Sequence, residues 1–218
     1  MISPMSCSAF ARATADRATR MKEETDTLGK KIGMWLFLYT EIMLFGGLFV
    51  VYANYYHRYT EEFIEGGQSL SLVTGGVNTV LLLVSSFTVA ASISALRKGS
   101  EKASLVFLGS AVLMGLSFLG NKYFEWGDKF AHGIYPSSPA LAEGPQGLAV
   151  FFGLYYTITG LHALHVVIGL VLLTVSSALV WTGRLHAGNY LVLENSGLYW
   201  HLVDLIWIFI FPLFYLIL

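Results

Sequence analysis

Residues 194–218 read ENSGLYWHLVDLIWIFIFPLFYLIL, a stretch that is long and apolar enough to cross a bilayer as one helix. His201 and Asp204 lie inside it, one helical turn apart. A charged side chain in the hydrocarbon region costs on the order of 2.5–3.5 kcal/mol, so ionisable groups in a spanning helix indicate a functional role. Ionisable side chains also lie inside apolar stretches earlier in the sequence, at Glu41 and at His162 with His165.

The composition is that of a membrane protein, because 55% of the residues are hydrophobic and only 12% are charged. Five stretches reach the length of a transmembrane helix: 32–56, 72–96, 103–124, 148–181 and 197–218. The connections between them are too short for a second soluble domain. We therefore predict an all-α, polytopic fold, with a tail over residues 1–30 and one five-helix transmembrane domain over residues 31–218.

The N-terminal tail lacks the apolar segment of a signal peptide. Its basic first part could form a short amphipathic helix on a lipid surface, but its serine, alanine and charge content favours a solvated segment. Ten of the thirteen Lys and Arg residues fall on the side of the membrane that holds this tail. The excess predicts a cytoplasmic N-terminus and an external C-terminus.

Glu41 lies about 13 Å inside the first predicted span, counted at 1.5 Å per residue. At that depth its carboxyl group should face protein or a polar cleft, either on a proton path or as a ligand-orienting group. A plain hydrogen bond between helices, aided by Thr40, is an equally good interpretation. In the second span, serines such as Ser85 and Ser86 are interpreted as packing residues only.

His162 and His165 share one helix face near the middle of the fourth span, because residues three apart are neighbours on a helix. They could ligate haem together with His201, or hold a metal ion. The acids available to complete such a metal site are Glu41, Glu125 and Asp204. A di-iron bundle needs E-x-x-H pairs, which the predicted spans lack, and we therefore favour packing histidines.

Two further pairs of polar residues lie near the ends of predicted spans. Lys122 and Glu125 are three residues apart and should pair as an anchor at the outer boundary, where Tyr123 suits an aromatic belt. His201 and Asp204 can hydrogen-bond side by side, or face a lipid head group or a neighbouring subunit.

Five segments together resemble subunit III of haem-copper terminal oxidases, in its short, five-helix bacterial form. They are LFLYTEIMLFGGLF at 36–49, NTVLLLVSSFT at 78–88, FLGNKYFEW at 118–126, TGLHALHVVIG at 159–169 and GLYWHLVDLIWIFIFPLFYL at 197–216. They occur in the family's order and cover the chain from about residue 32 to its end. One departure is Lys122, which stands where many members carry glutamine.

The resemblance implies an accessory subunit of a proton-pumping oxidase that reduces oxygen with electrons from cytochrome c in the bacterial inner membrane. Such a subunit carries no catalytic residue, cofactor or metal, since haem and copper belong to partner chains. It contacts subunit I mainly, with subunit II and possibly a small subunit IV, and binds no nucleic acid. It holds phospholipids in a cleft between helices and supports proton uptake and oxygen access.

The resemblance also implies roles for particular residues. Glu41 matches a buried glutamate near lipid and the catalytic subunit, and Glu125 matches a glutamate at the end of the third span. The family's T-G-x-H-x-x-H and W-H-x-x-D elements correspond to His162, His165, Trp200, His201 and Asp204.

Three alternatives remain open from the sequence. The chain could be the accessory subunit of a quinol oxidase or of a nitric oxide reductase. It could also be a free-standing membrane cytochrome b, with His201 and either His162 or His165 as axial ligands.

Overall fold

The computed structural model describes residues 4–136 and 138–217, and these residues form helices and connecting turns without a β-strand. The helices are α1 (Pro4–Arg58), α2 (Thr60–Gln68), α3 (Leu72–Arg97), α4 (Glu101–Ala131), α5 (Pro139–Ala142), α6 (Gln146–Trp181) and α7 (Leu191–Tyr215). Five stretches are long and apolar enough to cross a membrane: Leu28–Arg58, Leu72–Arg97, Glu101–Ala131, Gln146–Trp181 and Leu191–Tyr215. The predicted all-α fold with five spans is therefore confirmed.

The chain divides into two compact units, residues 1–43 and residues 44–218. The first unit consists of the N-terminal part of α1. Its backbone is helical from Pro4 onward and continues without a break into the first candidate span. The N-terminal segment is thus neither an irregular tail nor a separate short helix, as the composition had suggested, but the beginning of α1.

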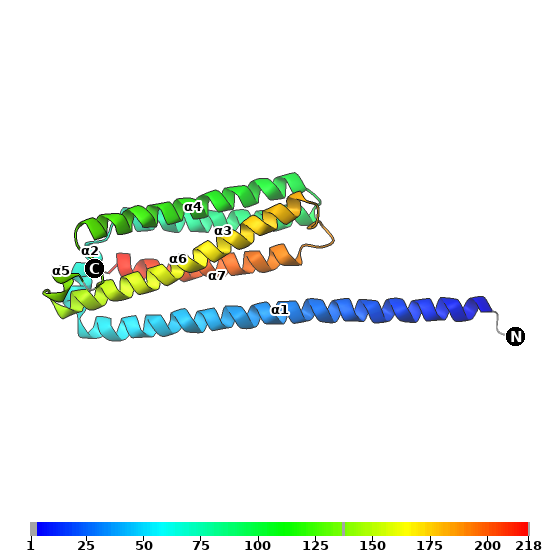
Figure 1. The fold of residues 1–218 in the computed structure, drawn as a ribbon, viewed down its shortest axis with the longest axis horizontal. Coiled ribbons are helices and arrows are strands. Elements are labelled where there is room, and N and C mark those ends of the chain that lie inside the picture. The colour runs from blue at the N-terminus through cyan, green and yellow to red at the C-terminus, as the bar shows by residue number, and fades with distance from the viewer. Residues whose placement is uncertain (1–3, 137, 218) are drawn as a thin grey trace. The chain divides into compact units, whose positions relative to one another are not determined.

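In the second unit, α3, α4, α6 and α7 run roughly alongside one another (Figure 1). Each of these helices packs on two of the others, so the four form a closed ring. The order around the ring is α3, α4, α6, α7, and α7 packs against α3. A tight turn at Gly99, whose φ of 79° is in the left-handed region, reverses the chain between α3 and α4. The short helices α2 and α5 both pack against α6.

Two fully buried tryptophans of α7 fill the centre of this ring. The Trp200 indole lies against Gly115 of α4 and Gly169 of α6, where an added Cβ would come within 2.8 and 2.6 Å of the ring. The indole nitrogens of Trp200 and Trp207 donate to Ser85 Oγ at 2.8 Å and to Thr79 Oγ1 at 3.0 Å. These bonds attach α7 to α3 and satisfy the buried N–H groups.

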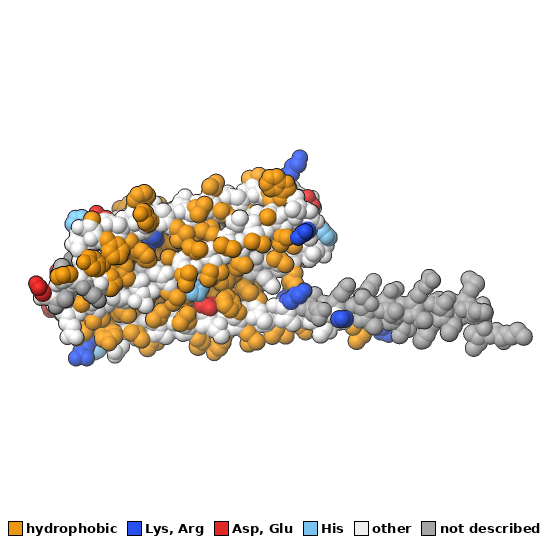
Figure 2. All heavy atoms as spheres, in the orientation of Figure 1, with side chains coloured by type: hydrophobic (Ala, Val, Ile, Leu, Met, Phe, Trp, Pro, Cys, Tyr) orange, Lys and Arg blue, Asp and Glu red, His pale blue; other side chains and the backbone are white. Residues whose placement is uncertain are grey.

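Hydrophobic side chains cover the visible flank of the four-helix ring (Figure 2). On α3 and α4, for example, Val73, Phe87, Val106 and Leu113 are between 66% and 76% exposed. Apolar surface on that scale is what a bilayer or a protein partner covers. At one end of the ring the Arg97 guanidinium pairs with Glu194 and lies 4.9 Å from the centre of the Tyr190 ring, which ties α3 to α7.

Candidate functional site

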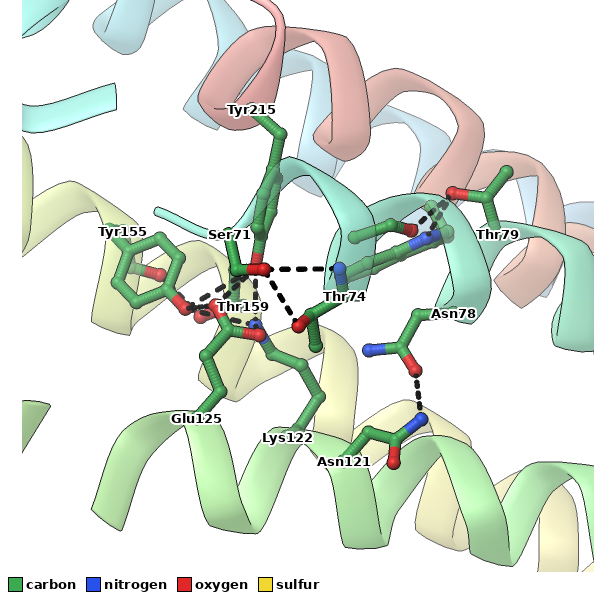
Figure 3. A network of polar contacts seen from close by, with 12 residues as sticks. Ser71, Thr74, Asn78, Thr79, Asn121, Lys122, Glu125, Tyr155, Thr159 and Tyr215 are labelled. Carbon is green, nitrogen blue, oxygen red and sulfur yellow. Dashed lines mark hydrogen bonds and ion pairs between the residues drawn. The ribbon is translucent and has the colours of Figure 1, made fainter. Parts of the chain in front are cut away.

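Four polar side chains meet inside the ring near the end where α3 begins and α4 ends (Figure 3). Lys122 Nζ donates to the hydroxyls of Tyr155 and Tyr215 at 2.9 and 2.8 Å, and lies 3.3 Å from Glu125 Oε2. Both tyrosine hydroxyls also donate to Glu125 Oε1 at 2.5 Å. We call these four residues the lysine–glutamate network. It joins α4, α6 and α7.

The burial of this network corrects one expectation. The predicted pairing of Lys122 with Glu125 is confirmed, but their side chains are only 3% and 7% exposed, so the pair is no interfacial anchor. The reason is that both side chains lie where α4 packs against α6, and the Tyr215 side chain of α7 reaches the same point. Lys122 Nζ also lies 5.5 Å from the centre of the Trp207 ring, a cation–π contact. Tyr123, in contrast, is 76% exposed and does suit an aromatic belt.

His162 of α6 is completely buried at the middle of the ring. Its imidazole lies between the rings of Phe118 and Trp207, with centroid distances of 5.7 and 5.2 Å. Within the described part of the chain neither of its nitrogens has a hydrogen-bond partner. A haem would need one of these nitrogens to face an open cavity, whereas aromatic rings pack around this imidazole. The surroundings of His162 therefore do not fit haem ligation, and, among the described residues, its imidazole packs between aromatic rings without the hydrogen bonds expected of a satisfied packing histidine.

His201 and Asp204 of α7 do not form the hydrogen bond that their spacing suggested. His201 Nδ1 instead lies 2.5 Å from Ser86 Oγ of α3, a hydroxyl that the sequence interpretation assigned to packing alone. Asp204 is 3% exposed, and neither carboxylate oxygen has a hydrogen-bond partner among the described residues. Ser86 also lies close to Asp204 without meeting hydrogen-bond geometry. The three side chains therefore form a small polar cluster between α3 and α7.

His165 and Glu41 are two further residues predicted from the sequence. His165 Nδ1 is 2.7 Å from the carbonyl oxygen of Leu161, and its ring meets Phe45 edge-on at 5.3 Å. Glu41 belongs to the first unit, where it is half-buried on α1. In the described residues, no three His, Cys, Asp or Glu side chains gather closely enough to hold a metal ion.

Three partners in these clusters were absent from the sequence prediction. Tyr155 and Tyr215 lie 30 and 90 residues from Glu125 in the chain, and Ser86 lies 115 residues from His201. No periodic pattern in the sequence signals pairs at such separations. The sequence identified the buried charges but not the residues that satisfy them.

The family model described as cytochrome c oxidase subunit III matches residues 8–217. The chain belongs to this family. It is 33% identical to cytochrome bo(3) ubiquinol oxidase subunit 3 of Pseudomonas aeruginosa, over 84% of this chain and 83% of that protein. It is 32% identical to a probable quinol oxidase subunit 3 of Staphylococcus saprophyticus, over 86% of this chain and 88% of the relative. A cytochrome c oxidase subunit 3 of Thermostichus vulcanus is 29% identical, over 85% of this chain and 86% of its own length.

Subunit III of an oxidase is part of a larger assembly, so this protein is a multi-pass membrane subunit that associates with other oxidase subunits. The match also extends the resemblance stated above, since it begins at residue 8 and includes most of the N-terminal segment.

Proposed function

We propose that this chain is a non-catalytic, cofactor-free subunit III of a proton-pumping haem-copper oxidase in the bacterial inner membrane. Haem and copper would reside in partner subunits, with subunit I as the main contact and subunit II and a small subunit IV nearby. The observation that carries the proposal is family membership over residues 8–217. The way in which the centre of the ring is filled supports it.

Large side chains occupy the space where a bundle would hold a cofactor. Trp200, Trp207, Phe118 and Tyr155 are completely buried there. The charged pair Lys122–Glu125 is satisfied by two hydroxyls of the same chain. The internal polar groups therefore hold the helices together, and the exposed apolar helix faces remain for lipid and for the catalytic subunit.

A supporting role in proton uptake and oxygen access would be exerted from these outer faces. We assign phospholipid contact to His201, which is half-buried beside Ser86, and to Glu41, which is half-buried on α1. A polar group that is partly exposed among apolar side chains suits the region of a lipid where the head group meets the acyl chains.

Cytochrome c is the proposed electron donor of the complex. Quinol is the second candidate, and it is favoured by the names of the relatives from Pseudomonas aeruginosa and Staphylococcus saprophyticus. The donor site would lie on partner subunits, so the residues of this chain do not choose between the two.

The test is purification of the native complex through an affinity tag on this chain. We expect a haem-containing oxidase to co-purify and to consume oxygen with reduced cytochrome c or with ubiquinol, which identifies the donor. A complex that lacks this chain should keep its haem spectrum but inactivate faster during turnover. Haem bound by the isolated chain at one equivalent, or recovery with a nitric oxide reductase, would refute the proposal.

A further inference from the structure

The hydroxyl groups of Tyr155 and Tyr215 share one carboxylate oxygen (Figure 3). Each donates to Glu125 Oε1 at 2.5 Å, a length typical of a hydrogen bond from a hydroxyl to an ionised carboxylate. The two phenolic oxygens lie 3.4 Å apart. A base within hydrogen-bond distance of a proton is placed to receive it. Glu125 is therefore placed to accept a proton from either tyrosine.

The protein encloses both phenol rings. Tyr155 is completely buried, and Tyr215 is 6% exposed. Lys122 Nζ donates to the two phenolic oxygens at 2.9 and 2.8 Å, so each oxygen would keep a hydrogen bond after its own proton had left. A phenoxyl radical decays by meeting a soluble reductant or a second radical. A radical formed on either of these rings would be shielded from both.

Side chains that can lose an electron lie next to each member of the tyrosine pair. The centre of the completely buried Trp207 ring is 6.3 Å from that of Tyr215. The Tyr156 ring lies 5.2 Å from the Tyr155 ring and 5.8 Å from the Trp126 ring. Indole and phenol are the most easily oxidised aromatic side chains, and rings in contact exchange electrons readily. The pair is thus in electronic contact with the centre of the ring of helices through Trp207.

The charges around these rings decide where an oxidising equivalent comes to rest. Trp207 would become a radical cation on losing an electron, and the Lys122 ammonium group, 5.5 Å from its ring centre, opposes that charge. The Trp207 indole nitrogen donates to Thr79 Oγ1, and a hydroxyl is too weak a base to take its proton. A tyrosine that gives its proton to Glu125 instead becomes a neutral radical, which the ammonium group does not repel. The equivalent should therefore leave Trp207 for the tyrosine pair.

We propose that the lysine–glutamate network is a radical site, at which Tyr155 or Tyr215 reduces oxidised Trp207. A one-electron oxidant first takes an electron from Trp207 and is itself reduced. The O–H bond of one tyrosine then breaks: its electron restores neutral Trp207, and its proton moves to Glu125 Oε1. The products are a neutral phenoxyl radical and a protonated Glu125, and the remaining positive charge is that of the hydrogen-bonded Lys122. A one-electron reductant and the proton on Glu125 later regenerate the tyrosine.

The substrate class of this site is a strong one-electron oxidant. In an oxidase complex, such an oxidant would be a partly reduced oxygen species or a protein radical, and this part of the inference rests on the proposed function. The radical chemistry itself does not, since Trp207 and the four residues of the network all belong to this chain. The site would move oxidising equivalents away from the tryptophans that hold the helices together.

The first test photo-oxidises the purified full-length chain in detergent with a ruthenium tris(bipyridine) dye and persulfate. We expect a tyrosyl radical that outlives those on exposed rings, identified by electron paramagnetic resonance of protein with ring-deuterated tyrosine. Tyr155→Phe with Tyr215→Phe should lose this persistent signal. The matched control Tyr199→Phe should keep it, because Tyr199 is a buried tyrosine of α7 whose hydroxyl donates to the backbone oxygen of His165 at 3.2 Å and has no carboxylate there.

A second double variant tests the proton acceptor. Lys122→Met with Glu125→Gln keeps both tyrosines and an oxygen that accepts from their hydroxyls, but an amide takes up no proton at neutral pH. It should lose the persistent radical while unfolding near the wild-type temperature. In the wild type, the radical should form more slowly in heavy water, because a proton moves with the electron. A wild type without a persistent tyrosyl radical, or an equal signal in either double variant, would overturn the proposal.

A further experiment follows Trp207 in the purified oxidase complex. After exposure to hydrogen peroxide, peptide mass spectrometry measures the fraction of oxygenated Trp207. This fraction should rise in Tyr155→Phe with Tyr215→Phe, because no tyrosine there reduces the oxidised indole, and should stay at the wild-type level in Tyr199→Phe. An unchanged fraction in the double variant would refute electron transfer to Trp207. If the chain purifies without an oxidase, the proposed function fails, and photo-oxidation of the isolated chain still decides whether the radical site exists.

Discussion

Lys122 and Glu125 illustrate how a charged pair is accommodated within a membrane-spanning bundle. Lys122 has two hydroxyl acceptors and one carboxylate, and Glu125 accepts from the same two hydroxyls. Burial of two charges is costly, and the ion pair together with the hydrogen bonds to both tyrosine hydroxyls offsets that cost. Removal of one partner leaves the other charge in a site that water does not reach.

We predict that Glu125→Leu destabilises the ring by about 3–5 kcal/mol, because it leaves a buried ammonium group without a counter-ion. The double variant Lys122→Met with Glu125→Gln should regain most of this loss, since the amide oxygen still accepts from the tyrosine hydroxyls. The unfolding temperatures of the wild type and the two variants, measured on the purified chain in one detergent, show the loss of stability and its recovery. If Glu125→Leu unfolds at the wild-type temperature, the network makes no contribution to stability.

For single residues, the sequence predicts which side chains pair within one helix. It does not predict which side chains pair between helices. The Lys122–Glu125 pair follows from the spacing of three, because α4 is regular there. The same spacing misleads for His201 and Asp204, because the Ser86 hydroxyl competes successfully for the imidazole. The rotamer that His201 adopts depends on how α3 packs against α7. A single sequence does not show how these two helices pack.

Among the elements, α6 and α7 approach each other closely at Gly169. A Cβ at that position would lie 2.6 Å from Trp200 Cε3 and 3.4 Å from Tyr199 Cε1, and both rings are buried. Gly153 lies on the same helix, but nothing is within 4 Å of its added Cβ. Glycine is therefore required by packing at Gly169 and not at Gly153.

We predict that Gly169→Ala destabilises the ring by about 1–3 kcal/mol, because the Trp200 indole cannot move without displacing α4 or α3. Gly153→Ala should be neutral, or stabilising by up to about 1 kcal/mol, because alanine is the better helix former. The two unfolding temperatures, measured side by side, separate packing from helix propensity. Equal shifts for the two variants would contradict the close approach.

The bounds of the elements show what hydropathy predicts and what it misses. The second predicted span, 72–96, agrees with α3, since polar residues flank this helix closely on both sides. In contrast, α4 runs seven residues past the predicted end at 124, and α7 begins six residues before the predicted start at 197. Backbone hydrogen bonds continue through polar residues such as Lys129 and Glu194, although hydropathy falls there.

At the scale of the whole molecule, the closed ring buries several small polar side chains while large apolar side chains face outward. Asn78, Thr159 and Ser176 are completely buried, whereas valine and leucine face outward along α3 and α4. Without water outside, burial of apolar surface between helices gives little driving force, and polar contacts and close packing must hold them together. The hydrophobic outer face then fixes the protein in a bilayer, and only the charges at the helix ends select its direction.

The charge distribution makes the direction of insertion testable with the one native cysteine, Cys7. In a Cys7→Ser background, Glu143→Cys reports the connection before α6, and Arg184→Cys reports the connection after it; both positions are exposed. A membrane-impermeant maleimide applied to intact spheroplasts should label Glu143→Cys and spare Arg184→Cys, since most Lys and Arg residues are predicted to be cytoplasmic. The wild-type Cys7 should also be spared until the cells are lysed. The reverse labelling pattern would contradict the predicted orientation.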